Sequence, residues 1–369
     1  MNTHLTCPAG RKKTMRLIFR GEVLSAVCLF LAVSAAAPAQ LPSNGSQAGV
    51  ATSMSNKPIT GRASGVSLTL SVLDEKMHPL DRQAVVKLMD ENTKTPTWQP
   101  TTETSDATFD VGLGKYDIEV SAVGYLTGRK EISVISTLQP IPVKIALLRD
   151  PDAVDFSADD SSTPAKASKD VKRAISDLKS GPIRFKEAQK HLDAAYAQAP
   201  ASAQVNFLLG YLAFQQNDLD HAQTYLDKAT AIDPHDVQAL NLSGRLHLVK
   251  HDYAGAVATL EQAVAARPEN ATAHSLMADA YLNQKDYKNA LAQADLAIAQ
   301  GKSGTSSVQI VRGQALANLG HEDEAIQTLK TYLQAAPDTA SAPQVRQFVA
   351  TLEQRHSNTP SGTAQPPKQ

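Results

Sequence analysis

Between about residues 62 and 148, apolar residues alternate with polar or small ones. Val66, Leu68 and Leu70 alternate in this way, and Tyr116 and Ile118 begin a second run of the same kind. A period of two residues is typical of a strand with one buried face. Further candidate strands lie near residues 84–89, 107–111, 130–135 and 143–147. About six or seven short strands separated by turn residues predict a small antiparallel β-sandwich.

The second half of the chain repeats with a period of thirty-four residues. Small residues recur at Gly210, Gly244 and Ala278, and aspartate and proline recur in a fixed phase with them. The aspartates are Asp218, Asp252 and Asp286, and the prolines are Pro200, Pro234 and Pro268. Together, the spacing, the small residues and the prolines resemble the tetratricopeptide repeat, a unit of two antiparallel helices. About five units begin near Lys169, Ala203, Val237, Ala271 and Ser306, and a capping helix is expected at residues 340–355.

Elementary helix packing explains this period. Two helices approach to about 8–10 Å only where the residues in contact are small, which accounts for the glycine or alanine of the first helix. Each aspartate falls where the second helix begins and is expected to act as its N-cap. Each proline ends a unit because it cannot continue a helix. No unit can bury its apolar face alone, so the resemblance implies a right-handed all-α solenoid of stacked units.

One segment of the predicted sandwich is more specific. Residues 114–125 read GKYDIEVSAVGY, and this pattern resembles the late strands of the carboxypeptidase regulatory-like domain, a transthyretin-like sandwich. Gly124 is expected to permit a tight turn that returns Tyr125 onto the sandwich, while Tyr116 packs in its core. The resemblance covers residues 62–148 and implies an accessory module without catalytic residues.

Residues 1–39 have the pattern of a secretory signal peptide. Five basic residues precede an apolar run at residues 23–37, which ends in small residues of the kind that signal peptidase reads. Cleavage removes both cysteines, Cys7 and Cys28, and leaves 31 Lys and Arg against 36 Asp and Glu. The exported chain then has no thiol chemistry, and its negative charge disfavours nucleic acid as a partner. Two alternatives stay open: an uncleaved membrane anchor, and a true start at Met15.

Three further segments are predicted to lack a packed core. Residues 40–61 form a flexible lead and residues 356–369 a disordered tail, because both are rich in polar residues and proline. Residues 149–168 form an acidic linker with few large apolar residues, flexible enough to span about 25 Å.

The family resemblance places one face of each first helix on a concave groove. The candidate partner-binding residues on that face are Phe207, Tyr211, Phe214, Gln215, Asn241, Arg245, Asp279 and Asn283. Members of the family that clamp an acidic peptide terminus carry several Lys and Arg there, whereas this groove offers mainly Arg173 and Arg245. The groove is therefore expected to be mixed in character rather than basic.

Phe207, Tyr211 and Phe214 have the i, i+4, i+7 spacing of one helix face. One interpretation is that they anchor an apolar side chain of a partner, while Asn241 and Arg245 fix its backbone. The other is that they pack against neighbouring helices or the β-domain, which is the commoner role of aromatic stripes. The sequence leaves both interpretations open.

These features predict an exported, non-enzymatic scaffold, periplasmic or secreted and most consistent with a bacterial envelope. It binds a protein or peptide and needs no cofactor or metal. His247 and His251 have the spacing of a metal-binding pair, but no Glu follows His247 as the metalloprotease motif requires. The alternative is a cell-envelope or glycan-binding accessory protein, in which the sandwich binds and the solenoid is a spacer or an oligomer contact. A third possibility, a hydrolase with dispersed catalytic residues, has no supporting motif.

Overall fold

The computed structural model describes residues 65–136, 139–151, 153–154, 156, 165–301 and 307–358. The predicted signal peptide and lead lie outside these ranges, as does the predicted tail beyond residue 358. Within them, a β-domain comes first and a row of helices follows. The chain therefore combines an N-terminal β-sandwich with a helical solenoid, as the sequence predicted.

The β-domain consists of two sheets packed face to face. Its strands are β1 (Val66–Leu73), β2 (Val85–Asp90), β3 (Pro96–Pro100), β4 (Asp106–Val111), β5 (Gly114–Ser121), β6 (Gly128–Val134) and β7 (Ile141–Ala146). One sheet has the order β4-β1-β7, and the other has the order β3-β2-β5-β6. The alternating apolar residues, such as Leu68, Leu70 and Ile118, are buried in one core between the sheets. The apolar residues that recur at every second position in the sequence thus form the inward face of each strand.

Two features of the sandwich differ from the prediction. Strand β3 was not expected, and it forms the edge of the four-stranded sheet by pairing with β2. Strands β1 and β7 run parallel rather than antiparallel, with Leu70 opposite Val143. The parallel pair arises because the chain leaves the first sheet after β4, builds β5 and β6 in the other sheet, and then returns in the direction of β1.

The turn at Gly124 has the expected geometry. Gly124 has a φ of 82°, in the left-handed region that glycine adopts without steric cost. The Tyr125 N–H donates to the carbonyl oxygen of Ala122 at 3.1 Å, and the Tyr125 ring is buried in the sandwich core. The guanidinium groups of Arg82 and Arg149 lie 5.5 Å and 5.2 Å from the centre of that ring. Tyr125 therefore joins the sandwich core to the segment that leaves it.

The helices form antiparallel pairs. They are α1 (Ala165–Lys179), η2 (Gly181–Arg184), α2 (Phe185–Gln198), α3 (Ala203–Gln215), α4 (Leu219–Ile232), α5 (Val237–Val249), α6 (Tyr253–Ala266), α7 (Ala271–Asn283), α8 (Tyr287–Gln300), α9 (Val308–Asn318), α10 (Glu322–Ala335) and α11 (Ala342–Asn358). Helices α3, α5 and α7 begin where the repeat units were expected to begin. Helix α1 begins at Ala165, inside the predicted linker, and α9 begins at Val308 rather than near Ser306. Helix α11 continues three residues into the segment predicted as a tail.

The repeated aspartates cap the second helices, which confirms that prediction. The side chains of Asp218, Asp252 and Asp286 accept hydrogen bonds from the backbone N–H groups of His221, Gly255 and Asn289. The residue before each cap has a positive φ, at Asn217, His251 and Lys285. The thirty-four-residue period therefore encodes one helix–turn–helix corner that recurs in successive units.

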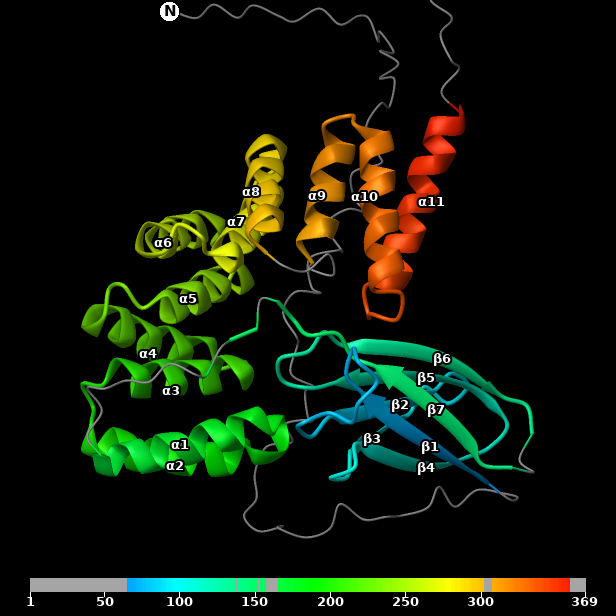
Figure 1. The fold of residues 1–369 in the computed structure, drawn as a ribbon, viewed down its shortest axis with the longest axis horizontal. Helices are drawn as coiled ribbons and strands as arrows, with labels where there is room; N and C mark the ends of the chain where they lie inside the picture. Colours follow the sequence, from blue (N-terminus) through cyan, green and yellow to red (C-terminus); the bar gives the residue numbers. More distant parts are fainter. Residues whose placement is uncertain are drawn as a thin grey trace, which may run out of the picture.

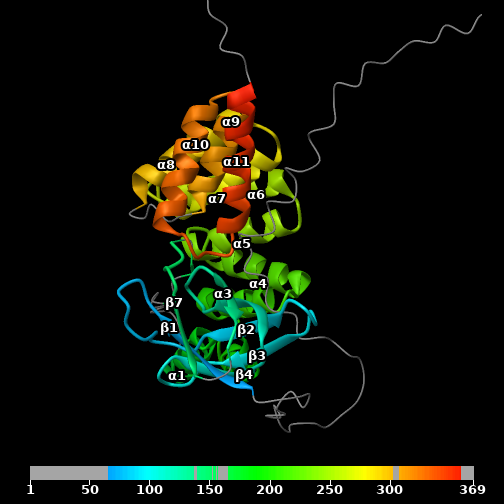
Figure 2. The same cartoon turned by 90° about the vertical axis from the view of Figure 1, so that its right-hand side faces the viewer.

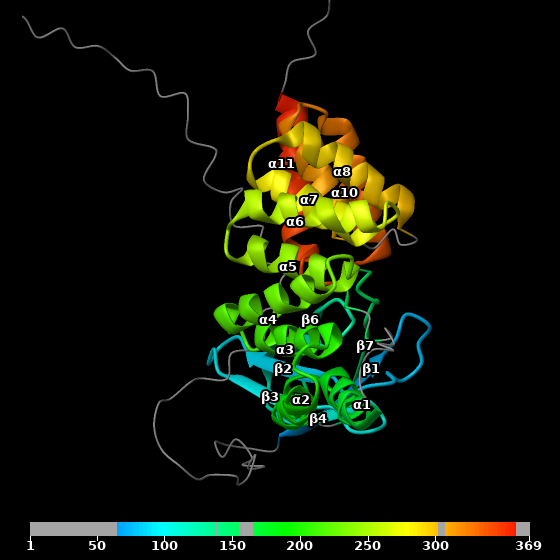
Figure 3. The ribbon, with the colours of Figure 1, turned by 90° about the vertical axis from the view of Figure 1, so that its left-hand side faces the viewer.

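The helices follow a curve, and the sandwich lies on the inner side of that curve (Figure 1). In the turned views the sandwich stays at the same end of the molecule as α1 and α3 (Figures 2 and 3). At the far end of the row, the loop after α10 pairs with β6: Arg129 N–H donates to the Asp338 oxygen at 2.7 Å, and Ala340 N–H donates to the Thr127 oxygen at 2.9 Å. The chain links the sandwich to the first helix, and these two hydrogen bonds attach it to the last helices as well.

Candidate protein-binding groove

Helix α3 carries the predicted aromatic stripe on the inner side of the curve. Phe207 and Tyr211 are only 5% and 4% exposed, and Phe214 is partly buried against the same core. All residues from Val205 to Ala213 are buried, so α3 is covered on every side. The stripe is thus a packed surface that other parts of the chain cover.

The cover on Tyr211 is the segment that links the two domains. The rings of Phe156 and Tyr211 meet edge to face, with centroids 4.9 Å apart and planes at 84°. Val154 and Phe156 both pack against the core formed by helices α1 to α5. The packing interpretation therefore holds for Tyr211, with a partner that neither alternative had named. Val154 and Phe156 of the predicted linker therefore pack against the groove.

The phenol of Tyr211 is held in its neutral form. Burial raises the pKa of Tyr211 far above its ordinary value of about 10. The charge of Arg245 and a hydrogen bond with Gln215 lower that pKa, but by less than burial raises it. The charges of Asp150 and Arg82 also act on this ring, in opposite directions: Asp150 raises the pKa and Arg82 lowers it.

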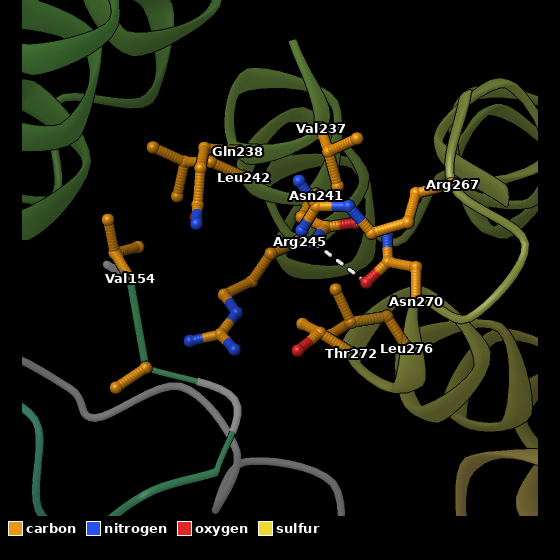
Figure 4. A pocket seen from close by; sticks show the side chains of 11 residues that line it. Val154, Val237, Gln238, Asn241, Leu242, Arg245, Arg267, Asn270, Thr272 and Leu276 are labelled. Atoms are coloured by element: carbon orange, nitrogen blue, oxygen red, sulfur yellow. Dashed lines mark hydrogen bonds between the residues drawn. The ribbon is translucent and has the colours of Figure 1, made fainter. Parts of the chain in front are cut away.

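A cavity of about 90 Å³ lies beside this contact. Its polar wall includes Asn241, Arg245, Asn270 and Thr272 from α5, α7 and the loop between α6 and α7, and Val154 of the linker closes one side. Figure 4 shows the Arg245 side chain reaching into the space between Val154 and Thr272. The volume holds a few water molecules, and the mixed lining offers hydrogen bonds to a peptide backbone.

Asn241 and Asn270 form a reciprocal pair at the edge of this cavity (Figure 4). The Asn270 amide donates to the Asn241 oxygen at 2.9 Å, and the Asn241 amide donates back at 3.3 Å. The Asn270 oxygen also accepts from the N–H of Ala273, so Asn270 caps α7. These bonds fix the orientation of the Asn241 amide on the groove face before any partner arrives.

The structure brings together some of the predicted site residues and separates others. Tyr211 and Gln215 share a hydrogen bond, and Asn241 and Arg245 line the cavity. Asp279 is buried, and the Asn283 amide donates to the Asp279 backbone oxygen within α7 at 2.7 Å. Neither Asp279 nor Asn283 lines the cavity.

Residues that sequence reasoning missed complete the site. Asn270, directly before α7, and Val154 of the linker line the cavity, and Phe156 of the linker covers Tyr211. Asn270 could have been found as the N-cap of α7, because it stands directly before the repeat start at Ala271. For Val154 and Phe156, the only signal in the sequence was that they are apolar residues in an acidic segment.

The histidines on and after α5 have local partners. His247 Nδ1 lies 2.9 Å from an Asp252 oxygen, and His251 Nδ1 lies 3.0 Å from the Tyr253 hydroxyl. Across the part of the chain that the structure describes, no three His, Cys, Asp or Glu side chains gather in a way that could hold a metal ion. Nor is any described helix both long and apolar enough to cross a membrane.

Comparison with protein families agrees with the geometry of the helices. Tetratricopeptide-repeat profiles match residues 183–246, 241–305 and 307–339. This helical region is made of tetratricopeptide repeats. The matches span helices α2 to α10, so the cavity and the Tyr211 contact lie on the tetratricopeptide-repeat part of the chain.

Solved tetratricopeptide-repeat structures resemble the chain at low identity. MamA from Desulfovibrio magneticus RS-1 is 19% identical, with 47% of this chain and 96% of that chain covered and a TM-score of 0.42. The pilF protein of Pseudomonas aeruginosa is 18% identical, with 52% and 86% covered and a TM-score of 0.46. YrrB, described as having an unusual peptide-binding site, is 21% identical, with 46% and 85% covered and a TM-score of 0.40. A search of curated proteins finds no match.

Proposed function

We propose that this protein is an exported, non-enzymatic scaffold that binds a protein or peptide partner through the concave face of its tetratricopeptide repeats. One observation carries this proposal: the groove already holds an apolar segment, with Phe156 on the Tyr211 ring and Val154 at the wall of a polar cavity. A surface that packs the apolar side chains of one segment has the shape and the polar groups to pack those of another. The fixed helices and the Asn241–Asn270 pair make the receptor preorganised, which spares the entropy cost of ordering it on binding.

Site-specific crosslinking tests this assignment. A photoreactive amino acid is placed at Thr272, which lines the cavity, or at Glu261, which is exposed on α6. After irradiation in the producing cells, the adducts are identified by mass spectrometry. We expect a defined adduct from residue 272 that is absent from residue 261. Identical adducts at both positions, or none at residue 272, would contradict the groove assignment.

Export is a separate part of the proposal. It is supported by the basic and then apolar pattern of residues 1–39. N-terminal sequencing of the protein recovered outside the cytoplasm is expected to begin at Gln40. A chain that keeps residues 1–39 and sediments with membranes would favour the uncleaved anchor.

We further propose that residues 62–148 form a carboxypeptidase regulatory-like domain, which is supported by the Gly124 turn and the buried Tyr125 ring.

A second candidate function assigns binding to the sandwich. Trp98 on the edge strand β3 is 37% exposed, and its neighbour across the strands is Lys87, whose Nζ lies 5.2 Å from the ring centre. The same row continues through Glu119 to Arg129, so an indole stands beside polar groups that could bind a sugar. Retention of the whole chain on envelope polysaccharide tests this. Loss of retention in Trp98→Ala but not in Tyr211→Ala would favour the sandwich over the groove.

A further inference from the structure

The segment that covers Tyr211 is fixed at its start to the sandwich. Arg149 forms a β-bridge with Tyr125, and the Asp150 N–H donates to the Gly124 oxygen at 3.1 Å. Ala153 N–H then donates to the Asp150 oxygen at 3.1 Å, which turns the chain toward the groove. The turn at Gly124 therefore determines where the next apolar side chains reach the helices.

Two side chains of this segment enter the groove, and they are two residues apart. Val154 lines the cavity beside Arg245, and Phe156 lies against Tyr211. A free peptide in an extended conformation places its residues i and i+2 on the same side, so it could present the same two kinds of side chain to the groove. The pattern that the groove accepts is an aliphatic residue followed, after one residue, by an aromatic residue.

The charges near this contact favour an acidic peptide. Two arginines, Arg245 and Arg267, line the cavity. The sequence of the segment, RDPDAVDF at residues 149–156, contains three aspartates, and Asp150 acts on the Tyr211 ring. Opposite charges on the two sides of an interface fix the register of a bound chain and disfavour partners of the wrong charge.

We propose that the linker stretch carrying Val154 and Phe156 is a built-in ligand of the groove, and that the partner is an extended acidic peptide with the same aliphatic-x-aromatic pattern that replaces it. This inference rests on the proposed function and specifies its ligand. A tethered segment has an effective concentration on the order of mM, so it holds the groove against a free peptide of similar affinity. The wild-type protein is therefore mostly closed, and binding of the partner requires release of Phe156.

A labelled synthetic peptide of residues 148–160, LRDPDAVDFSADD, serves as the probe in trans. Its binding to the full-length chain is measured by fluorescence anisotropy for the wild type and for Val154→Ala/Phe156→Ala. We expect the double variant to bind the peptide at least about tenfold more tightly than the wild type, because its own segment no longer fills the site. Circular dichroism verifies that the variant is folded, and the single Phe156→Ala variant provides the same comparison if the double variant is not.

Two controls identify the site. Adding Tyr211→Ala to the open variant is expected to weaken binding of the peptide at least about tenfold, and a peptide with alanine at both anchors is expected not to bind. Equal affinity of wild type and open variant, or no binding to a folded open variant at about 1 mM peptide, would overturn the built-in ligand. A wild-type dimer that becomes a monomer in the open variant would overturn it as well, since the segment would then belong to a second copy.

This test and the crosslinking test fail independently. A defined adduct at residue 272 together with no binding of the synthetic peptide would leave the scaffold function in place and reject only the ligand chemistry. Peptide binding without any adduct at residue 272 would support the closed groove and reject an external partner under the conditions used.

Discussion

Gly244 of α5 and Leu260 of α6 pack so closely that a Cβ atom on Gly244 would lie 2.5 Å from the Leu260 Cγ. The same relationship recurs sixteen residues apart in two other units, at Gly210 with Leu226 and at Gly313 with Leu329. In the remaining unit of this kind, Ala278 replaces glycine, and the residue sixteen positions later is Ala294 instead of leucine. In these four units the residue of the first helix and the residue sixteen positions later are thus matched in size: glycine faces leucine, and alanine faces alanine.

Gly244→Ala is expected to lower the free energy of unfolding by about 1–3 kcal/mol, because the added methyl group overpacks a buried contact. Helix propensity alone would act in the opposite direction by about 1 kcal/mol, so the sign of the change is informative. Urea unfolding of the wild type and the variant measures it.

The double variant Gly244→Ala/Leu260→Ala supplies the control. It reproduces the alanine pair of residues 278 and 294, so we expect it to be less destabilised than the two single changes together, with a coupling of about 0.5–3 kcal/mol. Strict additivity of the two changes would show that the pair is not in contact.

The sequence predicted the parts of the fold whose contacts lie close together along the chain. The helix pairs were predictable because each unit solves the same packing problem with small residues and an aspartate cap inside thirty-four residues. Strand β3 was missed because Pro96 and Pro100 bound it and its residues are mostly polar, which is not the pattern of a buried strand. It forms because pairing along β2 supplies hydrogen bonds that a local pattern does not encode.

The candidate site was predictable only on one side. The groove face, including Tyr211 and Arg245, followed from the resemblance to the tetratricopeptide repeat. Its cover did not, because Val154 and Phe156 are isolated apolar residues in an acidic segment and they meet helices far away in the sequence. A segment of this composition satisfies the usual criteria for a flexible linker, and only the folded groove gives its two apolar side chains a place to pack.

Lys285→Gly is expected to stabilise the solenoid by about 0.5–1 kcal/mol. Lys285 follows α7 with a φ of 63°, a left-handed conformation that a residue with a Cβ atom adopts at a cost. The corresponding corner after α9 has Gly320, with a φ of 87°. A Cβ atom there would meet nothing within 4 Å, so Gly320→Ala isolates the backbone effect.

Thermal unfolding of both variants measures this effect. We expect Lys285→Gly to raise the transition temperature and Gly320→Ala to lower it, since glycine is favoured at both corners. A change of the same sign in both variants would mean that side-chain contacts, and not the positive φ, determine the stability of the corner.

Asp252 is expected to make the stability of the third unit depend on pH in the acid range. The hydrogen bond from the Gly255 N–H lowers the pKa of Asp252 below its ordinary value of 3.8, and the bond with His247 adds to this. A carboxyl group whose pKa is lower in the folded state stabilises that state fully above about pH 4. The stabilisation is lost as the pH falls through the folded-state pKa.

Asp252→Asn distinguishes the contribution of the carboxylate charge from that of the N-cap hydrogen bond. Asp252→Asn keeps an oxygen that can accept from Gly255, so we expect it to reduce the change in urea midpoint below about pH 4 and to retain most of the neutral-pH stability. Asp252→Ala removes the acceptor and is expected to be less stable at neutral pH as well. An unchanged acid dependence in both variants would assign it to other carboxyl groups.

Tyr332 connects the last repeat to the sandwich. Its buried hydroxyl lies 2.9 Å from the Thr339 hydroxyl and 2.7 Å from the Ser341 hydroxyl, in the loop that pairs with β6. Tyr332→Phe removes these bonds and leaves polar partners in a buried site, so we expect it to lower the free energy of unfolding by about 1 kcal/mol. The amide of Arg129, which donates to Asp338 of this loop, is expected to exchange its hydrogen faster.

Hydrogen exchange followed by mass spectrometry distinguishes loosening of the contact with the sandwich from global destabilisation. We expect faster exchange in residues 127–129 and 338–340 of Tyr332→Phe, while the amides of α5 and α6 keep their wild-type rates. Ser341→Ala is the matched control: it leaves Tyr332 bonded to Thr339 and is expected to have a smaller effect at the same amides. If exchange rises equally in every helix of Tyr332→Phe, the hydroxyl stabilises the last repeat alone and the sandwich is held by other contacts.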